Sequence, residues 1–138
     1  MRVFLDTNVI ASATATRGLC ADVFRSVIEF HELVVSDTLF QEIKRVLREK
    51  FDASDALIAD VLWLLQQDTI FAESKPLAEL HLKDSADIAM VSSAINGRAE
   101  LFVTGDKEIL ALKRVHDLEI VSPRQFWERI KGQPPESA

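Results

Sequence analysis

The chain has 138 residues, of which 48% are hydrophobic and 28% charged, and this composition fits one globular domain with a substantial core. Its 22 acidic residues against 16 Lys and Arg give a net charge of −6, which excludes a passive nucleic-acid coat, because such a protein needs a basic surface. No apolar run reaches the roughly 18 residues that span a bilayer, no signal peptide is expected, and a single cysteine permits no internal disulfide, so we expect a cytoplasmic protein.

Short apolar runs that end at turn residues or carboxylates predict five buried β-strands. In chain order the strands cover residues 2–5, 33–35, 69–71, 101–104 and 118–121. Helical spacing of apolar residues predicts helices between them, at residues 20–30, 38–50, 54–65 and 84–95, after Asp106, and from Pro123 onward. This alternation predicts a three-layer α/β/α fold with a roughly five-stranded parallel sheet. We expect one domain over residues 1–131 and a disordered tail over residues 132–138, which contain two prolines.

Four carboxylates occupy positions that this fold would bring together. Asp6 follows the first strand, and Asp106 follows the strand at residues 101–104. Because the carboxyl ends of parallel strands meet at one edge of a sheet, we expect both acids at that edge. Glu42 borders the apolar stripe of the helix at residues 38–50, and Asp87 faces inward near the start of a later helix.

Each acid also has a simpler role, and these alternatives stay open. Three acids can cap the helices that follow them, namely Asp6, Asp84 and Asp106. Glu42 can pair with Arg45 or Arg48, and Asp87 can be a favourable charge in a first helical turn. Such roles do not explain four acids at one edge without a buried cation to match them, since the cluster would repel itself. Hard oxygen ligands of this kind suit Mg²⁺ or Mn²⁺, whereas the three scattered histidines predict no zinc site.

The segments Val3-Phe4-Leu5-Asp6-Thr7-Asn8 and Val103-Thr104-Gly105-Asp106-Lys107, with two acids between them, resemble the PIN-domain ribonuclease family. The resemblance covers about residues 1–130 and is greatest to the toxin components of bacterial and archaeal toxin–antitoxin pairs. It implies a catalytic and metal-binding set formed by Asp6, Glu42, Asp87 and Asp106. It also implies polar supporting residues, which are Thr7, Asn8, Asp84 and Thr104. Relatives often have a proline and a further acid just before the Asp87 position, where this chain has Ser85 and Ala86, so Asp84 is the candidate helper acid.

The resemblance implies hydrolysis of RNA phosphodiester bonds with one or two Mg²⁺ or Mn²⁺ ions, which activate water and hold the developing phosphate charge. No histidine base or Ser/Cys nucleophile is then required. The expected partners are an RNA substrate, a small antitoxin protein bound over the acidic cleft, and a second copy of the chain in a homodimer. The basic face formed by Lys44, Arg45 and Arg48 fits either a guide for RNA or an ordinary solvated helix surface.

Two other functions compete with a nuclease. An aspartyl-phosphate phosphatase needs a second acid two residues after its nucleophile, where this chain has Asn8, and a phosphoacceptor receiver needs an acidic pair that Asp6 does not provide. The second rival is a catalytically silent PIN-like binding module. The presence of all four acids counts against that module.

Overall fold

A computed structural model describes residues 1–131, which form a six-stranded sheet with strand order β3-β2-β1-β4-β6-β5. The strands are β1 (Arg2–Leu5), β2 (Glu32–Ser36), β3 (Ile70–Ala72), β4 (Leu101–Val103), β5 (Arg114–Val115) and β6 (Leu118–Val121). Neighbouring strands pair in parallel, except that β5 pairs antiparallel with β6. The sheet is therefore parallel over five of its strands.

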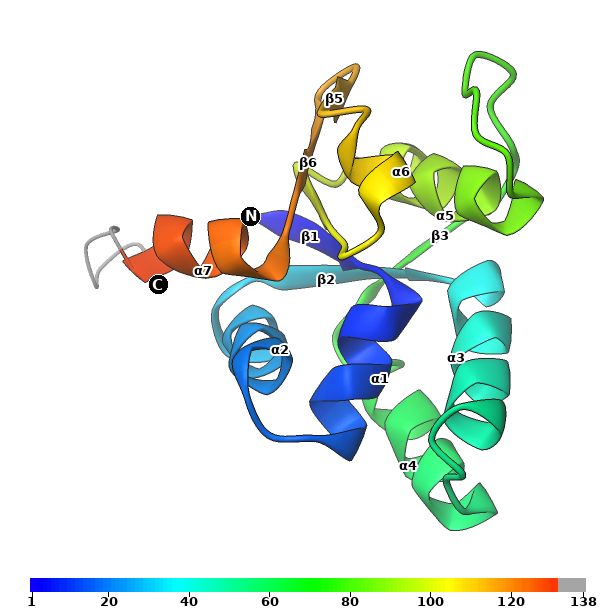
Figure 1. The fold of residues 1–138 in the computed structure, drawn as a ribbon, viewed down its shortest axis with the longest axis vertical. Coiled ribbons are helices and arrows are strands. Elements are labelled where there is room, and N and C mark those ends of the chain that lie inside the picture. The colour runs from blue at the N-terminus through cyan, green and yellow to red at the C-terminus, as the bar shows by residue number, and fades with distance from the viewer. Residues whose placement is uncertain (132–138) are drawn as a thin grey trace.

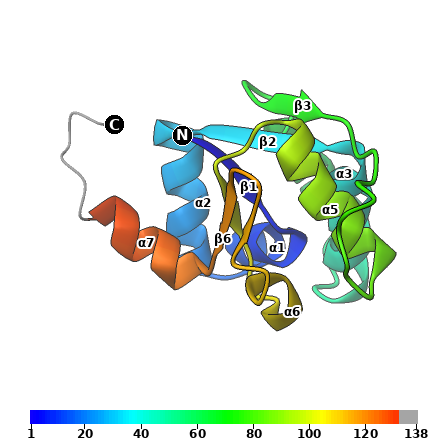
Figure 2. The ribbon, with the colours of Figure 1, turned by 90° about the horizontal axis from the view of Figure 1, so that it is seen from above.

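Helices cover both faces of this sheet. They are α1 (Thr7–Ala15), α2 (Leu19–Phe30), α3 (Asp37–Glu49), α4 (Asp55–Leu64), α5 (Ser85–Asn96), α6 (Lys107–Leu110) and α7 (Pro123–Lys131). Helices α1 to α4 lie on one side of the sheet, and α5 and α6 lie on the other (Figure 1). Seen from above, α3 and α5 lie at one side of the molecule, and α2 and α7 at the opposite side (Figure 2). No helix within residues 1–131 is both long and apolar enough to cross a membrane.

The central strands are buried on both faces, which explains their continuous apolar sequences. Val3, Phe4 and Leu5 of β1 have no exposed surface. The rings of Phe4 and Phe102 stack across β1 and β4 with centroids 5.2 Å apart. Burial of such aromatic pairs contributes strongly to folding stability and fixes the register of the two strands.

The predicted three-layer α/β fold and its five parallel strands are confirmed, and the elements predicted with bounds have ends shifted by one or two residues. Helix α1 is predicted only as a helix that Asp6 can cap, without bounds. The sixth strand, β5, is absent from the prediction because it is only two residues long and carries no apolar alternation. Lys113 and His116, on either side of β5, both adopt positive φ, and the chain turns back after β5 to pair antiparallel with β6. The predicted tail, residues 132–138, lies outside the described residues, and the domain bounds stay a prediction.

The order of the strands brings the ends of β1 and β4 together. The chain leaves β1 toward β2 on one side, whereas β4 pairs with β1 on the other side. Such a reversal of strand order opens a crevice at the carboxyl ends of the strands. Leu5 pairs with Val103, and the amide of Asp6 donates to the carbonyl oxygen of Val103 at 2.9 Å. The residues that follow the two strands are thus neighbours.

Gly97, directly after α5, lies where a side chain would overlap the core. A Cβ atom there would come within 2.5 Å of Val34 Cγ1 and 2.9 Å of Ala72 Cβ. We expect Gly97→Ala to lower the free energy of unfolding by about 1–3 kcal/mol, as overpacking of a core does, measured by urea denaturation. Gly105→Ala is the control, because its Cβ would meet nothing within 4 Å. Equal effects of the two substitutions would contradict overlap as the cause.

Candidate active site

Asp6 is held at the end of β1 by hydrogen bonds to both of its carboxylate oxygens. Its side chain caps α1, where Oδ1 accepts from the amide of Thr7 at 2.8 Å. Oδ2 accepts from the hydroxyl of Thr104 at 2.6 Å. Asp6 is only 8% exposed, so a carboxylate is fixed in a largely buried place.

Thr104 connects the ends of β1 and β4. While its hydroxyl donates to Asp6, the same oxygen accepts from the amide of Asp106 at 3.0 Å. Asp106 in turn caps α6, with Oδ1 accepting from the amides of Glu108 and Ile109 at 2.8 and 3.1 Å. The buried hydroxyl of Thr104 therefore sets the distance between two acidic residues that are far apart in sequence.

Two further acids lie at the start of α5. Asp84 caps this helix by accepting from the amide of Ala86 at 2.8 Å. Asp87 lies in the first turn, and its carboxyl group has a pKa raised to about 7. Partial burial is the main cause, and the nearby charges of Asp106, Asp84 and Asp6 add to it.

Glu42 lies on α3, beside the buried stripe of Leu39, Ile43, Val46 and Leu47. Its carboxylate receives a hydrogen bond from Arg45 at 2.9 Å, so the ion pair considered as an alternative is present. The Glu42 side chain is 25% exposed and that of Arg45 48%, and such a pair contributes little to stability. The ion pair is compatible with a place in the candidate site, because Glu42 and Arg45 both line one cleft with the other acids.

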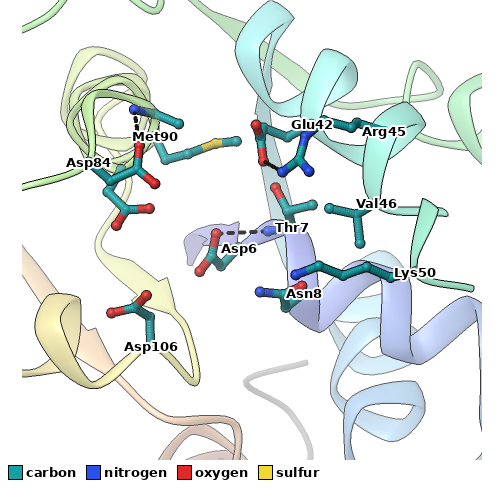
Figure 3. A pocket seen from close by; sticks show the side chains of 12 residues that line it. Asp6, Thr7, Asn8, Glu42, Arg45, Val46, Lys50, Asp84, Met90 and Asp106 are labelled. Atoms are coloured by element: carbon teal, nitrogen blue, oxygen red, sulfur yellow. Dashed lines mark hydrogen bonds and ion pairs between the residues drawn. The ribbon is translucent and has the colours of Figure 1, made fainter. Parts of the chain in front are cut away.

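One cleft of about 300 Å³ joins these elements (Figure 3). Its lining residues are Asp6, Thr7, Asn8, Glu42, Arg45, Val46, Lys50, Asp84, Ala86, Asp87, Met90 and Asp106. All four acids of the predicted catalytic set and three of the four supporting residues are among them. The fourth, Thr104, is buried behind the cleft and reaches it through Asp6. The structure thus brings together residues from α1, α3, α5 and the ends of β1 and β4.

Lys50 and Met90 line the cleft but are not among the residues predicted from the sequence. A signal for Lys50 exists, because it follows the buried Val46 by four residues and so continues the inner side of α3. Met90 follows Asp87 by three residues on α5 and is 2% exposed, which looks like an ordinary core position in the sequence.

The charges in the cleft are unbalanced. Five of its lining residues are acids, whereas only Arg45 and Lys50 are cations. The pKa of Asp6 is raised, mainly by burial; the hydrogen bonds from Thr104 and Thr7 oppose this effect, and the charges of Asp106 and Glu42 reinforce it. A cation placed among these carboxylates would offset the desolvation cost of their buried charges. It would also reduce the repulsion between them.

The donor atoms of the cleft fit a hard divalent cation. The carboxylate oxygens are ligands that Mg²⁺ and Mn²⁺ prefer. In addition, Thr7 Oγ1 is buried and has no hydrogen-bond partner within the described part of the chain. Residues 1–131 contain no group of three or more Asp, Glu, His or Cys side chains already arranged around one metal position. An ion would therefore need some of these carboxylates to turn toward it, while hydrogen bonds hold those of Asp6 and Asp106 in place.

The raised pKa of Asp87 makes stability depend on pH. The pKa of Asp87 is 3.8 in its usual state and about 7 in the folded protein. Between these two pH values Asp87 holds its proton more tightly in the folded protein than in the unfolded chain, so the free energy of unfolding falls as pH rises through this range. We expect Asp87→Asn, in EDTA, to melt above the wild type at pH 8 and close to it at pH 4. Asp60→Asn, an equal loss of charge on the exposed side of α4, is the control. Parallel melting curves across the pH range would contradict a raised pKa.

The fold and the cleft define a three-layer α/β protein with an acidic site where the strand order of its sheet reverses. A family model described as PIN domain matches residues 2–108, and the chain belongs to the PIN-domain family. The resemblance predicted from the sequence is thereby confirmed.

Two solved structures have a similar fold. One is the crystal structure of VapBC2 from Rickettsia felis bound to a DNA fragment from their promoter, with a TM-score of 0.62 and 15% identity over 88% of this chain and 98% of that chain. The other is the PIN domain endonuclease Utp24, with a TM-score of 0.53 and 16% identity over 88% of this chain and 84% of that chain. A comparison with curated proteins gave no match. At these identities the similarity shows a shared fold.

Proposed function

We propose that this protein is a cytoplasmic endoribonuclease that depends on Mg²⁺ or Mn²⁺ and acts as the toxin of a toxin–antitoxin pair. One observation carries the proposal: Asp6, Glu42, Asp87 and Asp106 come from four separate elements and line one cleft at the carboxyl ends of β1 and β4. Membership of the PIN-domain family and the similarity to an endonuclease structure support the same reaction.

The four acids would hold the metal, which when bound activates water and offsets charge on the phosphate. The chain holds two of these four carboxylates in place with hydrogen bonds. Thr104 and the amide of Thr7 hold the Asp6 carboxylate in one orientation, and the amides at the start of α6 hold that of Asp106. Asp87 has a pKa of about 7, so it must lose its proton to bind a cation, and metal affinity should increase with pH.

The proposed toxin role rests on the similarity to the VapBC2 structure, which is bound to a DNA fragment from their promoter. A small antitoxin would bind over the acidic cleft and block access to it. A homodimer is also proposed, for which Phe30, Trp63 and Phe71 offer exposed apolar side chains. Co-expression with the product of a small neighbouring reading frame, followed by co-purification and loss of cleavage, would test the antitoxin. Light scattering would test the dimer.

The direct test is cleavage of RNA by the purified protein. We expect internal cuts in a single-stranded RNA blocked at both ends, in Mg²⁺ or Mn²⁺ and not in EDTA. A phosphatase or receiver would instead release phosphate or accept it from a phosphodonor, and a silent binding module would leave RNA intact. Intact RNA under all metal conditions would contradict the proposal, provided that the protein is folded by circular dichroism.

Metal binding should also raise thermal stability. Mn²⁺ at a hundredfold excess over its Kd should stabilise the folded state by about 2.7 kcal/mol, because it binds the folded chain and not the unfolded one. KCl of equal ionic strength is the control for screening of the acidic cluster. An unchanged melting curve in millimolar Mn²⁺ would argue against a metal site in this cleft.

A further inference from the structure

One side of the cleft carries acids and no cation, and the other side carries both cations of its lining. Figure 3 shows Asp84 and Asp106 on one side, and Arg45, Lys50 and Asn8 on the other, where Glu42 lies paired with Arg45. The acidic side comes from α5 and the start of α6, whereas the other side comes from α3 and α1. An RNA strand that places one phosphate among the acids and their metal must therefore continue past groups of a different chemistry.

Only one of the two cations is already paired with carboxylates. Arg45 contacts Glu42 at 2.9 Å and Glu49 at 3.8 Å. Lys50 makes no ion pair or side-chain hydrogen bond with any described residue, although it lines a cleft that contains five acids. Its amino group extends into the cleft in Figure 3. Lys50 is thus available to a ligand.

Asn8 supplies a second donor on the same side. It is exposed, it lines the cleft, and its side chain makes no hydrogen bond within residues 1–131. An ammonium group and a neutral amide facing one space provide donors for the oxygens of a phosphate. The cleft volume of about 300 Å³ corresponds to roughly ten water molecules, which leaves room beside the acids.

We infer that Lys50, together with Asn8, binds an RNA phosphate that neighbours the phosphate being cleaved. The inference rests on the proposed function and adds a positioning subsite to it. Lys50 would hold the strand in register over the acids without touching the reacting atoms. Its position at the C-terminal end of α3 also lets it interact with the helix dipole, so the test needs a readout that such a structural role does not change.

Lys50→Gln and Lys44→Gln form a matched pair for this test. Both remove one positive charge from an exposed lysine at α3, but Lys44 does not line the cleft. Binding of a fluorescent single-stranded 12-nucleotide RNA is measured in an Asp87→Asn background, which is expected to leave the RNA intact. Lys50→Gln should weaken binding about fivefold to tenfold and lower the slope of log K against log salt by about 0.7. Lys44→Gln should stay within about twofold.

Further variants separate a phosphate contact from other roles. In the otherwise wild-type chain, Lys50→Gln should raise KM by the same factor and leave kcat within about threefold. Asn8→Ala should weaken binding without changing the salt slope, because it removes a neutral donor. Lys50→Arg should keep most of the affinity, since it keeps the charge.

The possible failures are distinguishable. If the wild type binds and cleaves RNA but Lys50→Gln behaves like Lys44→Gln, the subsite is wrong and the proposed function stands. A fall in kcat with unchanged KM would also overturn the subsite, because Lys50 would then act on the reaction itself. If the wild type neither binds nor cleaves RNA, the subsite and the proposed function are both wrong.

Discussion

Asp6→Asn is expected to give a folded protein whose RNA cleavage is at least about 10-fold to 100-fold slower than that of the wild type, because loss of a proposed metal ligand should cost no less than loss of a group that supports one. Asn keeps the size of the side chain and can still accept the hydrogen bond from the amide of Thr7 that caps α1. It removes the charge that burial and the neighbouring acids disfavour. Rates are measured on the end-blocked RNA at saturating Mn²⁺.

The stability of this variant provides a second measurement. In EDTA it should melt at or above the wild-type temperature, since a raised carboxylate pKa means that the ionised form is disfavoured in the folded state. In Mn²⁺ the order should reverse, because the wild type gains more from metal binding. Asp60→Asn on α4 is the control for loss of one charge away from the cleft. Full activity of Asp6→Asn would remove Asp6 from the catalytic set.

Glu42→Gln is expected to remove most cleavage at limiting Mn²⁺ and to recover part of it in excess metal. Gln keeps the shape of the side chain but offers a neutral oxygen to the cation, so metal affinity and cleavage should fall together while the fold is kept. If Glu42 only forms its surface pair with Arg45, neither property should change much. The readouts are the Mn²⁺ concentration for half-maximal cleavage and the Kd from calorimetry.

Glu49→Gln is a matched control for Glu42→Gln. Glu49 is on the same helix and contacts the same Arg45, at 3.8 Å, but it does not line the cleft. The substitution should leave the Mn²⁺ dependence as in the wild type. Arg45→Gln breaks the ion pair from its other side and should leave metal affinity equal or higher, because it removes a competing cation. Wild-type metal dependence of Glu42→Gln would assign this residue to the ion pair alone.

Much of the fold follows from local patterns in the sequence. The central strands are buried on both faces, so they are continuous apolar runs such as Val3-Phe4-Leu5, and the polar residue after the run marks its end. Helix starts are visible because Asp84 and Ser36 cap them. Strand β5 is different: it is only two residues long, and it is preceded by Lys113 at positive φ, a conformation that a lysine does not indicate.

The sequence predicts which acids belong to the candidate site. It does not predict the hydrogen bonds and packing contacts that join them. Asp6 and Asp106 follow strands, and this position alone places them at one edge of a parallel sheet. The structure adds that a helix-capping role does not exclude a place in the site. Asp6, Asp84 and Asp106 each cap a helix and line the cleft at the same time. The hydrogen bond from Thr104 to Asp6 and the position of Lys50 depend on how strands and helices pack, which no local spacing encodes.

The hydrogen bond between Thr104 and Asp6 joins residues 98 positions apart in the chain. During synthesis, β1 emerges first and can pair with β2 once α1 and α2 have been made, but its other edge has no partner until β4 has been made. Pairing of such distant segments is slow, since the connecting chain must first be ordered. The cleft is consequently among the last features to form on the ribosome, and a nascent chain that ends before residue 101 contains neither Thr104 nor Asp106. Partly made molecules therefore lack the complete acidic site.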